Sequence, residues 1–325
     1  MRHRDLSIFT AQLIAVWASA LSASAVALPP GNPPLSRGEI VITETFNDLF
    51  RIDPGTGQKA ALDPGSFDPR DMIQIDGGLG VVAVDFMDRL VRFDPESLAV
   101  TPLTATLFPG AVDLAVEPSG DILVADQDRI FRVDHATGVT QPLVDDPNIN
   151  GGFFSISSLA VGPTGRIFIT EFFREIWEIN PATGAATTPF FPNAGSILDL
   201  IDIRSDGDII VQDFPSGNLL RINYDTRVVT TFATGLPTFT QDLAIEADDD
   251  VVVSSLEGIF RYDSTTGAES LLTPDETFFS PRAIAVAPVP EPSTMALALV
   301  AAVICTRGRV SPKTRGRVTV IQRRG

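Results

Sequence analysis

Residues Leu114 to Leu143 read LAVEPSGDILVADQDRIFRVDHATGVTQPL, and this stretch decides the fold. It contains four short apolar or alternating runs, LAV, ILVAD, RIFRVD and VTQPL, which are separated by the turns PSGD, QD and HATG. Short runs bounded by Gly, Asp and Ser are typical of strands joined by tight turns. The stretch therefore predicts one antiparallel meander of four strands.

The same unit recurs along the chain. Its third strand is found as DLFRID, DRLVRFD, DRIFRVD, REIWEIN, GNLLRIN and EGIFRYD, which end at Asp53, Asp94, Asp134, Asn180, Asn223 and Asp263. The intervals between these end residues are 41, 40, 46, 43 and 40. A period of this size with four strands per unit is typical of a propeller blade. We therefore expect an all-β protein, a six-bladed β-propeller of four-stranded antiparallel blades over residues 37–288.

The two ends of the repeat array complement each other. The first copy begins directly at its second strand, Gly38 to Ile42, and a spare first strand, Ala283 to Val286, follows the sixth copy. We expect this C-terminal strand to complete the first blade. The ring would then be closed without a long free sheet edge.

The phrase IWEINPATG, Ile176 to Gly184, resembles the repeats of the NHL, gluconolactonase and streptogramin-lyase group of propellers. The resemblance extends over nearly the whole repeat region and implies a fold, not a reaction. Enzymes of that group hold a metal, with histidines near it in streptogramin lyases and a Glu-Asn-Asp set in gluconolactonases. This chain has only two histidines, His3 and His135.

The N-terminus has a basic start, an apolar stretch and small residues that end in Ala25-Val26-Ala27. This layout predicts a secretory signal peptide over residues 1–27, with an N-terminal helix that is retained as the alternative. We therefore expect the protein to be exported.

Residues 289–325 predict a separate C-terminal segment. Prolines at 288, 290 and 292 exclude helix and favour an extended linker. The apolar run Met295 to Ile304 that follows is short for a membrane span, and a basic tail begins at Arg307. We expect a transient membrane contact through this segment, with a permanent anchor as the alternative.

The motif in the linker resembles the PEP-CTERM sorting signal of Gram-negative bacteria that make exopolysaccharide. Its residues are Val289, Pro290, Glu291, Pro292 and Ser293. The resemblance covers about the last 35 residues and implies an exosortase-like enzyme as a processing partner. It also implies a location at the cell surface or outside the cell.

The charge distribution excludes one class of partner. The formal net charge is -17, yet residues 1–5 carry +1 and residues from Arg307 onward carry +7, so the rest of the chain carries -25. Such a body repels phosphate backbones, and nucleic acid is not expected as a partner. The single cysteine, Cys305, lies in the C-terminal apolar run, so no disulfide or thiolate site is expected in the propeller.

An acid ends the second strand of five repeats and marks a possible ligand or metal rim. These acids are Glu44, Asp85, Asp126, Glu171 and Asp213, and Ser255 takes the position in the sixth repeat. Carboxylates on one rim could attract Ca²⁺. An acid before a tight turn can equally accept backbone N–H bonds there, which is a structural role.

Two further sets of polar residues recur. Arginines of the third strand, Arg51, Arg92, Arg132, Arg221 and Arg261, are expected to pair with acids of the adjacent blade. The starts of the inner strands read Met72, Asp113, Ser158, Leu200, Asp242 and Ala283. Asp113 and Asp242 are three blades apart, so they should face each other across the axis and could bind a cation or polar ligand.

Together these features favour an exported binding or structural module of the cell surface or extracellular matrix. Its partners would be surface proteins or exopolysaccharide. No cofactor is expected, with Ca²⁺ as a possible exception at the acidic rim. The alternative is a metal-dependent lactonase- or lyase-like enzyme, but no residue set in the sequence assembles a catalytic site.

Overall fold

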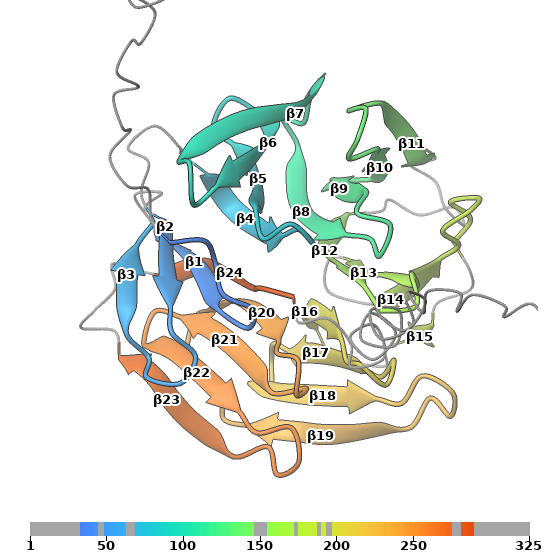
Figure 1. Ribbon diagram of the computed structural model, residues 1–325. Coiled ribbons are helices and arrows are strands. Elements are labelled where there is room, and N and C mark those ends of the chain that lie inside the picture. Colours follow the sequence, from blue (N-terminus) through green and yellow to red (C-terminus); the bar gives the residue numbers. More distant parts are fainter. Residues whose placement is uncertain are drawn as a thin grey trace, which may run out of the picture.

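The structure is a computed structural model in which residues 33–44, 49–62, 69–145, 155–171, 175–186, 190–192, 197–274 and 281–288 are described. These residues form 24 strands and no helix, and the strands make six four-stranded antiparallel sheets. The sheets stand around a central axis as the blades of a propeller (Figure 1). The predicted six-bladed propeller is confirmed.

The strands of each blade follow one another from the axis outward. Blade 1 is β24 (Pro281–Val286), β1 (Ile40–Glu44), β2 (Leu49–Ile52) and β3 (Lys59–Ala61). Blade 2 is β4 (Pro69–Ile75), β5 (Val81–Asp85), β6 (Arg89–Asp94) and β7 (Ala99–Leu107). Blade 3 is β8 (Ala111–Val116), β9 (Ile122–Asp126), β10 (Arg129–Val133) and β11 (Thr140–Val144).

The remaining blades have the same order. Blade 4 is β12 (Ile156–Val161), β13 (Ile167–Glu171), β14 (Glu175–Ile179) and β15 (Phe191–Pro192). Blade 5 is β16 (Leu198–Ile203), β17 (Ile209–Asp213), β18 (Asn218–Ile222) and β19 (Val229–Thr234). Blade 6 is β20 (Thr240–Ile245), β21 (Val251–Ser255), β22 (Gly258–Tyr262) and β23 (Glu269–Pro274).

The ring closes as expected from the repeat ends. Strand β24 pairs antiparallel with β1, so that Ile40 lies opposite Val286 and Val41 opposite Ala285. Beyond the strands, the Gly38 N–H donates to the Ala287 carbonyl at 2.9 Å. The last strand of the propeller therefore completes its first blade.

The second strand of each blade is buried on both faces, or buried except at its last residue, because neighbouring blades cover both faces. Every residue of β1, β5 and β21 is buried. Between blades 1 and 6, for example, Ile40 and Ile42 pack in one cluster with Val252 and Ile259. Outer strands such as β7 alternate between exposed and partly buried residues. The core therefore consists of layers between the blades.

The turns between third and fourth strands follow the predicted Asp-Gly chemistry. In blade 1 the Asp53 carboxylate accepts the N–H groups of Gly55 at 2.9 Å and Thr56 at 2.8 Å. Gly57 has a φ of 68°, and a Cβ there would overlap the Leu272 carbonyl of the neighbouring blade. Glycine is thus required both by the turn and by the packing between blades.

The alternating strand directions define two faces of the ring. The loop face carries the turns between second and third strands and the connections from one blade to the next, which hydrogen-bond to one another, as from Phe108 N–H to the Asp88 carbonyl at 2.8 Å. The opposite face, here called the end face, carries the other turns. The chain enters and leaves the ring on the end face, because Gly38 and Ala287 are joined there.

Four expectations lie outside the described residues: the signal peptide 1–27, the motif Val289 to Ser293, the membrane contact through Met295 to Ile304, and the basic tail. Within the described ranges, no helix is long and apolar enough to cross a membrane.

Candidate functional site

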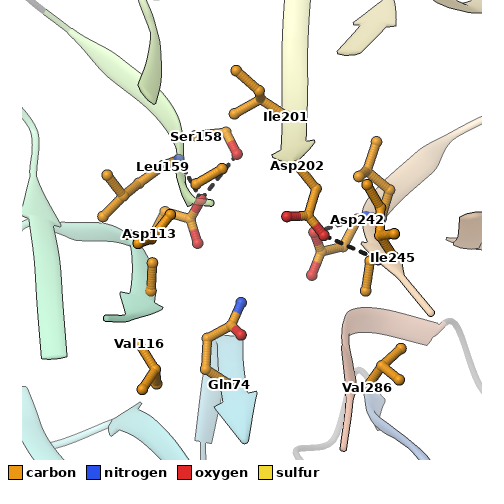
Figure 2. A pocket seen from close by; sticks show the side chains of 15 residues that line it. Gln74, Asp113, Val116, Ser158, Leu159, Ile201, Asp202, Asp242, Ile245 and Val286 are labelled. Atoms are coloured by element: carbon orange, nitrogen blue, oxygen red, sulfur yellow. Dashed lines mark hydrogen bonds between the residues drawn. The ribbon is translucent and has the colours of Figure 1, made fainter. Parts of the chain in front are cut away.

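The inner strands of the six blades surround the axis and enclose a cavity of about 110 Å³. Figure 2 shows four polar side chains directed toward the middle of this cavity, Gln74 from β4, Asp113 from β8, Asp202 from β16 and Asp242 from β20. The cavity is large enough for several water molecules. The structure therefore brings Asp113 and Asp242 into one channel and adds two residues that the sequence did not single out.

Asp113 connects blade 3 to blade 4. Its carboxylate accepts the N–H of Leu114 at 2.8 Å on its own strand. It also accepts the N–H of Leu159 at 2.7 Å and the hydroxyl of Ser158 at 2.9 Å, both from β12 of the next blade. The carboxylate thus bridges the gap between two inner strands that are not paired in one sheet.

Asp202 and Asp242 repeat this arrangement in blades 5 and 6. Asp202 accepts the N–H of Ile203 at 2.7 Å and that of Ile245 at 2.9 Å. Asp242 accepts the N–H of Leu243 at 2.8 Å and, as the second partner, the Ile284 N–H at 2.9 Å. Asp242 therefore holds the closing strand β24 against the inner strand of blade 6.

The three channel carboxylates titrate above the usual range of aspartate. Burial raises the pKa of Asp113 to about 6 and that of Asp202 to about 7. The N–H groups that donate to these carboxylates favour the ionised form and lower the two pKa values, but burial has the larger effect. Burial also raises the pKa of Asp242 well above its ordinary value, with repulsion from Asp113 and Asp202 as further causes. The side chains keep some exposure to the cavity, but the protein surrounds them on all sides. Asp113 and Asp202 therefore change their protonation state near neutral pH.

The channel lacks the parts of a nucleophilic site. No histidine, cysteine, lysine or arginine lines the cavity among the described residues. The one hydroxyl there, Ser158, donates to a carboxylate and has no imidazole beside it. The carboxylates could move protons, but no group that would attack or polarise a substrate accompanies them.

The channel also does not fit the metal sets that the family resemblance implies. Among the residues that the structure describes, neither histidine nor asparagine lines it, and the ligand atoms of Asp113, Asp202 and Asp242 do not converge within 4.8 Å. The one group in the described ranges whose ligand atoms do converge is Glu246, Asp248 and Asp250, in a turn on the end face.

The rim acids lie on the loop face, and four of the five, Glu44, Asp85, Glu171 and Asp213, contact a partner of their own blade. Glu44 pairs with Lys59, and Asp85 accepts the N–H groups of Met87 and Arg89, both at 2.9 Å. The Arg89 guanidinium also donates to Asp85 at 2.8 Å. These contacts are the structural role that acids play before tight turns.

The other three rim acids behave similarly but have fewer contacts. Glu171 accepts from the Trp177 indole at 3.4 Å, and Asp213 accepts from the Ser216 hydroxyl at 2.5 Å. Partial burial raises the pKa of Asp126, and the nearby Arg129 opposes this. In the described residues, the rim acids do not form a group that converges on one ligand position.

The third-strand arginines pair within their own blade, so the expectation of pairing with the adjacent blade is wrong. Arg51 binds Glu39 in blade 1, where the Nε–Oε1 distance is 2.6 Å. Arg261 binds Glu246 in blade 6, with distances of 2.5 and 2.8 Å. Each acid lies in or next to the turn into the second strand, and the hairpin of second and third strands folds back to place the arginine beside it. The remaining pairs are Arg92–Asp76, Arg132–Glu117 and Arg221–Asp208.

His135, the one histidine in the described residues, lies in the turn between β10 and β11. Its Nδ1 lies 3.0 Å from the Asp121 carboxylate in a neighbouring turn of the same blade. The ring is half exposed on the end face, far along the chain from any channel residue. It takes no part in the channel.

One signal could have revealed the missed channel residues, Asp202 and Gln74. Asp202 and Gln74 lie two positions further along their strands than Asp113 lies on β8, and alternation places them on the same side. Reading every second residue of each inner strand, and not only its start, would have included both.

Comparison with known proteins shows the fold alone. No protein-family model matches the chain, and no curated protein matches it. Among solved structures, the virginiamycin B lyase of Staphylococcus aureus is 18% identical with a TM-score of 0.54, and the match covers 75% of this chain and 84% of that one. A chain of a nidogen/laminin complex is 12% identical with a TM-score of 0.63, over 77% of this chain and 98% of that one. A protein assigned as a gluconolactonase is 12% identical with a TM-score of 0.54, and the match covers 70% of this chain and 86% of that one.

These neighbours include both enzymes and a protein taken from a binding complex. In all, 1440 solved chains match, so this fold is shared too widely to indicate a reaction. The resemblance of the repeats to lyase and gluconolactonase propellers is thus supported for the fold of the body.

Proposed function

We propose that the protein is an exported binding or structural module of the cell surface or extracellular matrix, processed at its C-terminal sorting signal. The observation that carries this proposal is the placement of the chain ends. The chain enters and leaves the ring on the end face, at Gly38 and Ala287. A propeller attached through the segment after Pro288 would therefore hold its loop face away from the attachment point.

A rigid ring supports such a role. Its loops are positioned by six blades and closed by the pairing of β24 with β1. Loops on a rigid scaffold are suited to recognise surface proteins or polysaccharide. The structural likeness to the chain from a nidogen/laminin complex is consistent with a binding propeller.

The test is the mass of the mature protein in its native host. We expect a protein that starts near Leu28 and has lost everything after about Pro292, recovered from the cell surface or the medium. A Glu291→Ala variant should keep its C-terminal segment and remain with the membrane fraction. An intact Gly325 in the exported wild-type protein would contradict processing by an exosortase-like enzyme.

The alternative is a lactonase- or lyase-like enzyme that uses the channel. It is favoured by the raised pKa values of Asp113 and Asp202, since such shifts cluster at active sites. Calorimetry of the full chain with Ca²⁺, Mg²⁺ or EDTA separates the two proposals. Tight binding of one metal with loss of stability in EDTA would favour the metal-dependent enzyme, and no metal effect would remove it.

A further inference from the structure

Exposed apolar side chains are concentrated on the loop face. Of the ten large hydrophobic residues that are exposed in the described ranges, seven lie on this face. Four belong to blades 2 and 3, and three belong to blades 5 and 6. The seven are Phe86, Met87, Leu107, Val112, Phe214, Phe239 and Leu256. An uneven distribution of this kind marks an interaction surface.

The three residues of blades 5 and 6, Phe214, Phe239 and Leu256, lie in three loops that are hydrogen-bonded to one another, and they are here called the 5/6 patch. Their exposed fractions are 59%, 69% and 36%. Hydrogen bonds hold their three loops together, because Leu236 N–H donates to the Gly217 carbonyl at 2.8 Å. Thr238 N–H donates to the Glu257 carboxylate at 3.0 Å. The patch is thus a fixed feature of the surface.

Phe239 has a backbone conformation that a bulky residue rarely adopts. Its φ is 55°, in the left-handed region that favours glycine and asparagine. Its side chain is 69% exposed, so it gains little from burial in the fold. Both features are unfavourable for folding, and strained exposed residues of this kind are found at binding sites.

The charge around the 5/6 patch is negative. The loops 214–217, 235–239 and 256–257 contain no lysine or arginine, and Glu257 is their one charged residue. Hydrogen bonds from the Thr238 hydroxyl and N–H hold the pKa of Glu257 below its usual range, so it stays ionised. Asp213 adjoins Phe214, and the propeller body as a whole is strongly acidic. A cationic partner is therefore attracted, whereas anionic lipid and acidic polysaccharide are repelled.

The apolar residues also distinguish between kinds of partner. They are Phe and Leu, which offer no hydrogen bond, and the Thr238 hydroxyl beside them is already bonded to Glu257. A sugar needs partners for its hydroxyl groups, while an apolar protein side chain does not.

On the basis of the binding role above, we propose that the 5/6 patch docks a protein segment with apolar anchor residues flanked by lysine or arginine. Phe214, Phe239 and Leu256 would contact the apolar anchors, and Glu257 would face the flanking cation. Since the chain enters and leaves the ring on the opposite face, at Gly38 and Ala287, a protein attached through its C-terminal segment would present the patch away from the attachment point.

The test uses the full-length protein and short synthetic peptides with one apolar centre flanked by lysine, by serine or by glutamate. We expect the order of affinity lysine, serine, glutamate. A Phe214→Ser, Phe239→Asn double variant should bind the lysine-flanked peptide about 30-fold more weakly, as expected for loss of interface anchors. Asparagine tolerates the left-handed conformation, so this variant should fold.

The matched control is a Val139→Ser, Val228→Ser variant, because these residues are 52% and 56% exposed on the end face. It should bind like the wild type. Equal binding of all three peptides, equal loss in both variants, or no peptide binding would overturn the proposal. Binding to phosphatidylglycerol vesicles in place of the peptides would overturn it in favour of a membrane. Processing is measured by mass alone, so failure of the peptide test leaves the proposed location and processing intact.

Discussion

The channel carboxylates predict that the protein is more stable in mild acid than in mild base. The ordinary pKa of an aspartate is 3.8, whereas Asp113 and Asp202 titrate at about 6 and about 7 in the fold. Between the unfolded pKa and the folded pKa values, these aspartates are therefore protonated in the folded state and ionised in the unfolded state. The stability that their protonation contributes to the fold is fully present below the unfolded pKa and is lost as the pH rises through the folded pKa values.

The size of the effect follows from the same values. A difference of one pKa unit corresponds to about 1.4 kcal/mol. Between pH 5 and pH 8, Asp113 loses about 1 kcal/mol of this contribution and Asp202 about 3 kcal/mol, which is about 4 kcal/mol together. Asp242 acts in the same direction, since burial and repulsion also raise its pKa.

The assay is urea denaturation of the wild type and of Asp202→Asn at pH 5, 6, 7 and 8. The asparagine oxygen can still accept an N–H from Ile203 or Ile245, but it carries no charge. We expect the difference in unfolding free energy between pH 5 and pH 8 to shrink by about 3 kcal/mol in the variant. The variant should also exceed the wild type in stability at pH 8.

The general acidity of the protein adds a pH dependence that the wild type and the variant share, so the comparison between them isolates Asp202. Asp134→Asn is the matched control, because hydrogen bonds from Thr137 lower the pKa of this exposed aspartate. It should leave the interval from pH 5 to pH 8 unchanged. The reasoning is refuted if the wild type is equally stable at pH 5 and pH 8, or if Asp202→Asn keeps the full wild-type difference.

Two further predictions concern the packing of the ring. Gly184→Ala should destabilise the protein by more than about 3 kcal/mol in the same urea assay, because the φ of Gly184 is 70° and a Cβ there would overlap the Leu143 carbonyl. Gly207→Ala should lower the free energy of unfolding by only about 1 kcal/mol, because the φ of Gly207 is 87° but a Cβ there would meet open space. A chain ending at residue 280 should fail to give a cooperative thermal transition, because blade 1 loses β24. A chain ending at Pro288 should melt like the full-length protein, and equal melting of the two shortened chains would contradict closure of the ring by β24.

The sequence predicted the parts of the channel that depend on the repeat. Asp113 and Asp242 occupy equivalent positions of inner strands three repeats apart, and a ring of six repeats places them in one cavity. Asp202 was missed because the position of its repeat that corresponds to Asp113 is Leu200, and the acid comes two positions later on the same side of the strand.

The arginine ion pairs, too, could be predicted from the sequence only in part. The spacing of Arg51 and Arg261 identified a repeated ion pair but not its partner. Glu39 and Glu246 are 12 and 15 residues upstream, and they lie beside the third strand only because the hairpin between them folds back. A side chain reaches the acid that the fold places nearest, and sequence distance does not measure this.

The sequence by itself determined the period, the number of blades and the closure of the ring, because strand alternation, turn residues and the spare strand Ala283 to Val286 are local features that repeat. Only the tertiary structure decided which polar groups meet. The carboxylate of Asp113 contacts Leu159, and that of Asp242 contacts Ile284, across gaps between separate sheets. It also decided that Phe214, Phe239 and Leu256 share one surface. Such contacts depend on the angle and distance between blades, which many residues set jointly and no single stretch encodes.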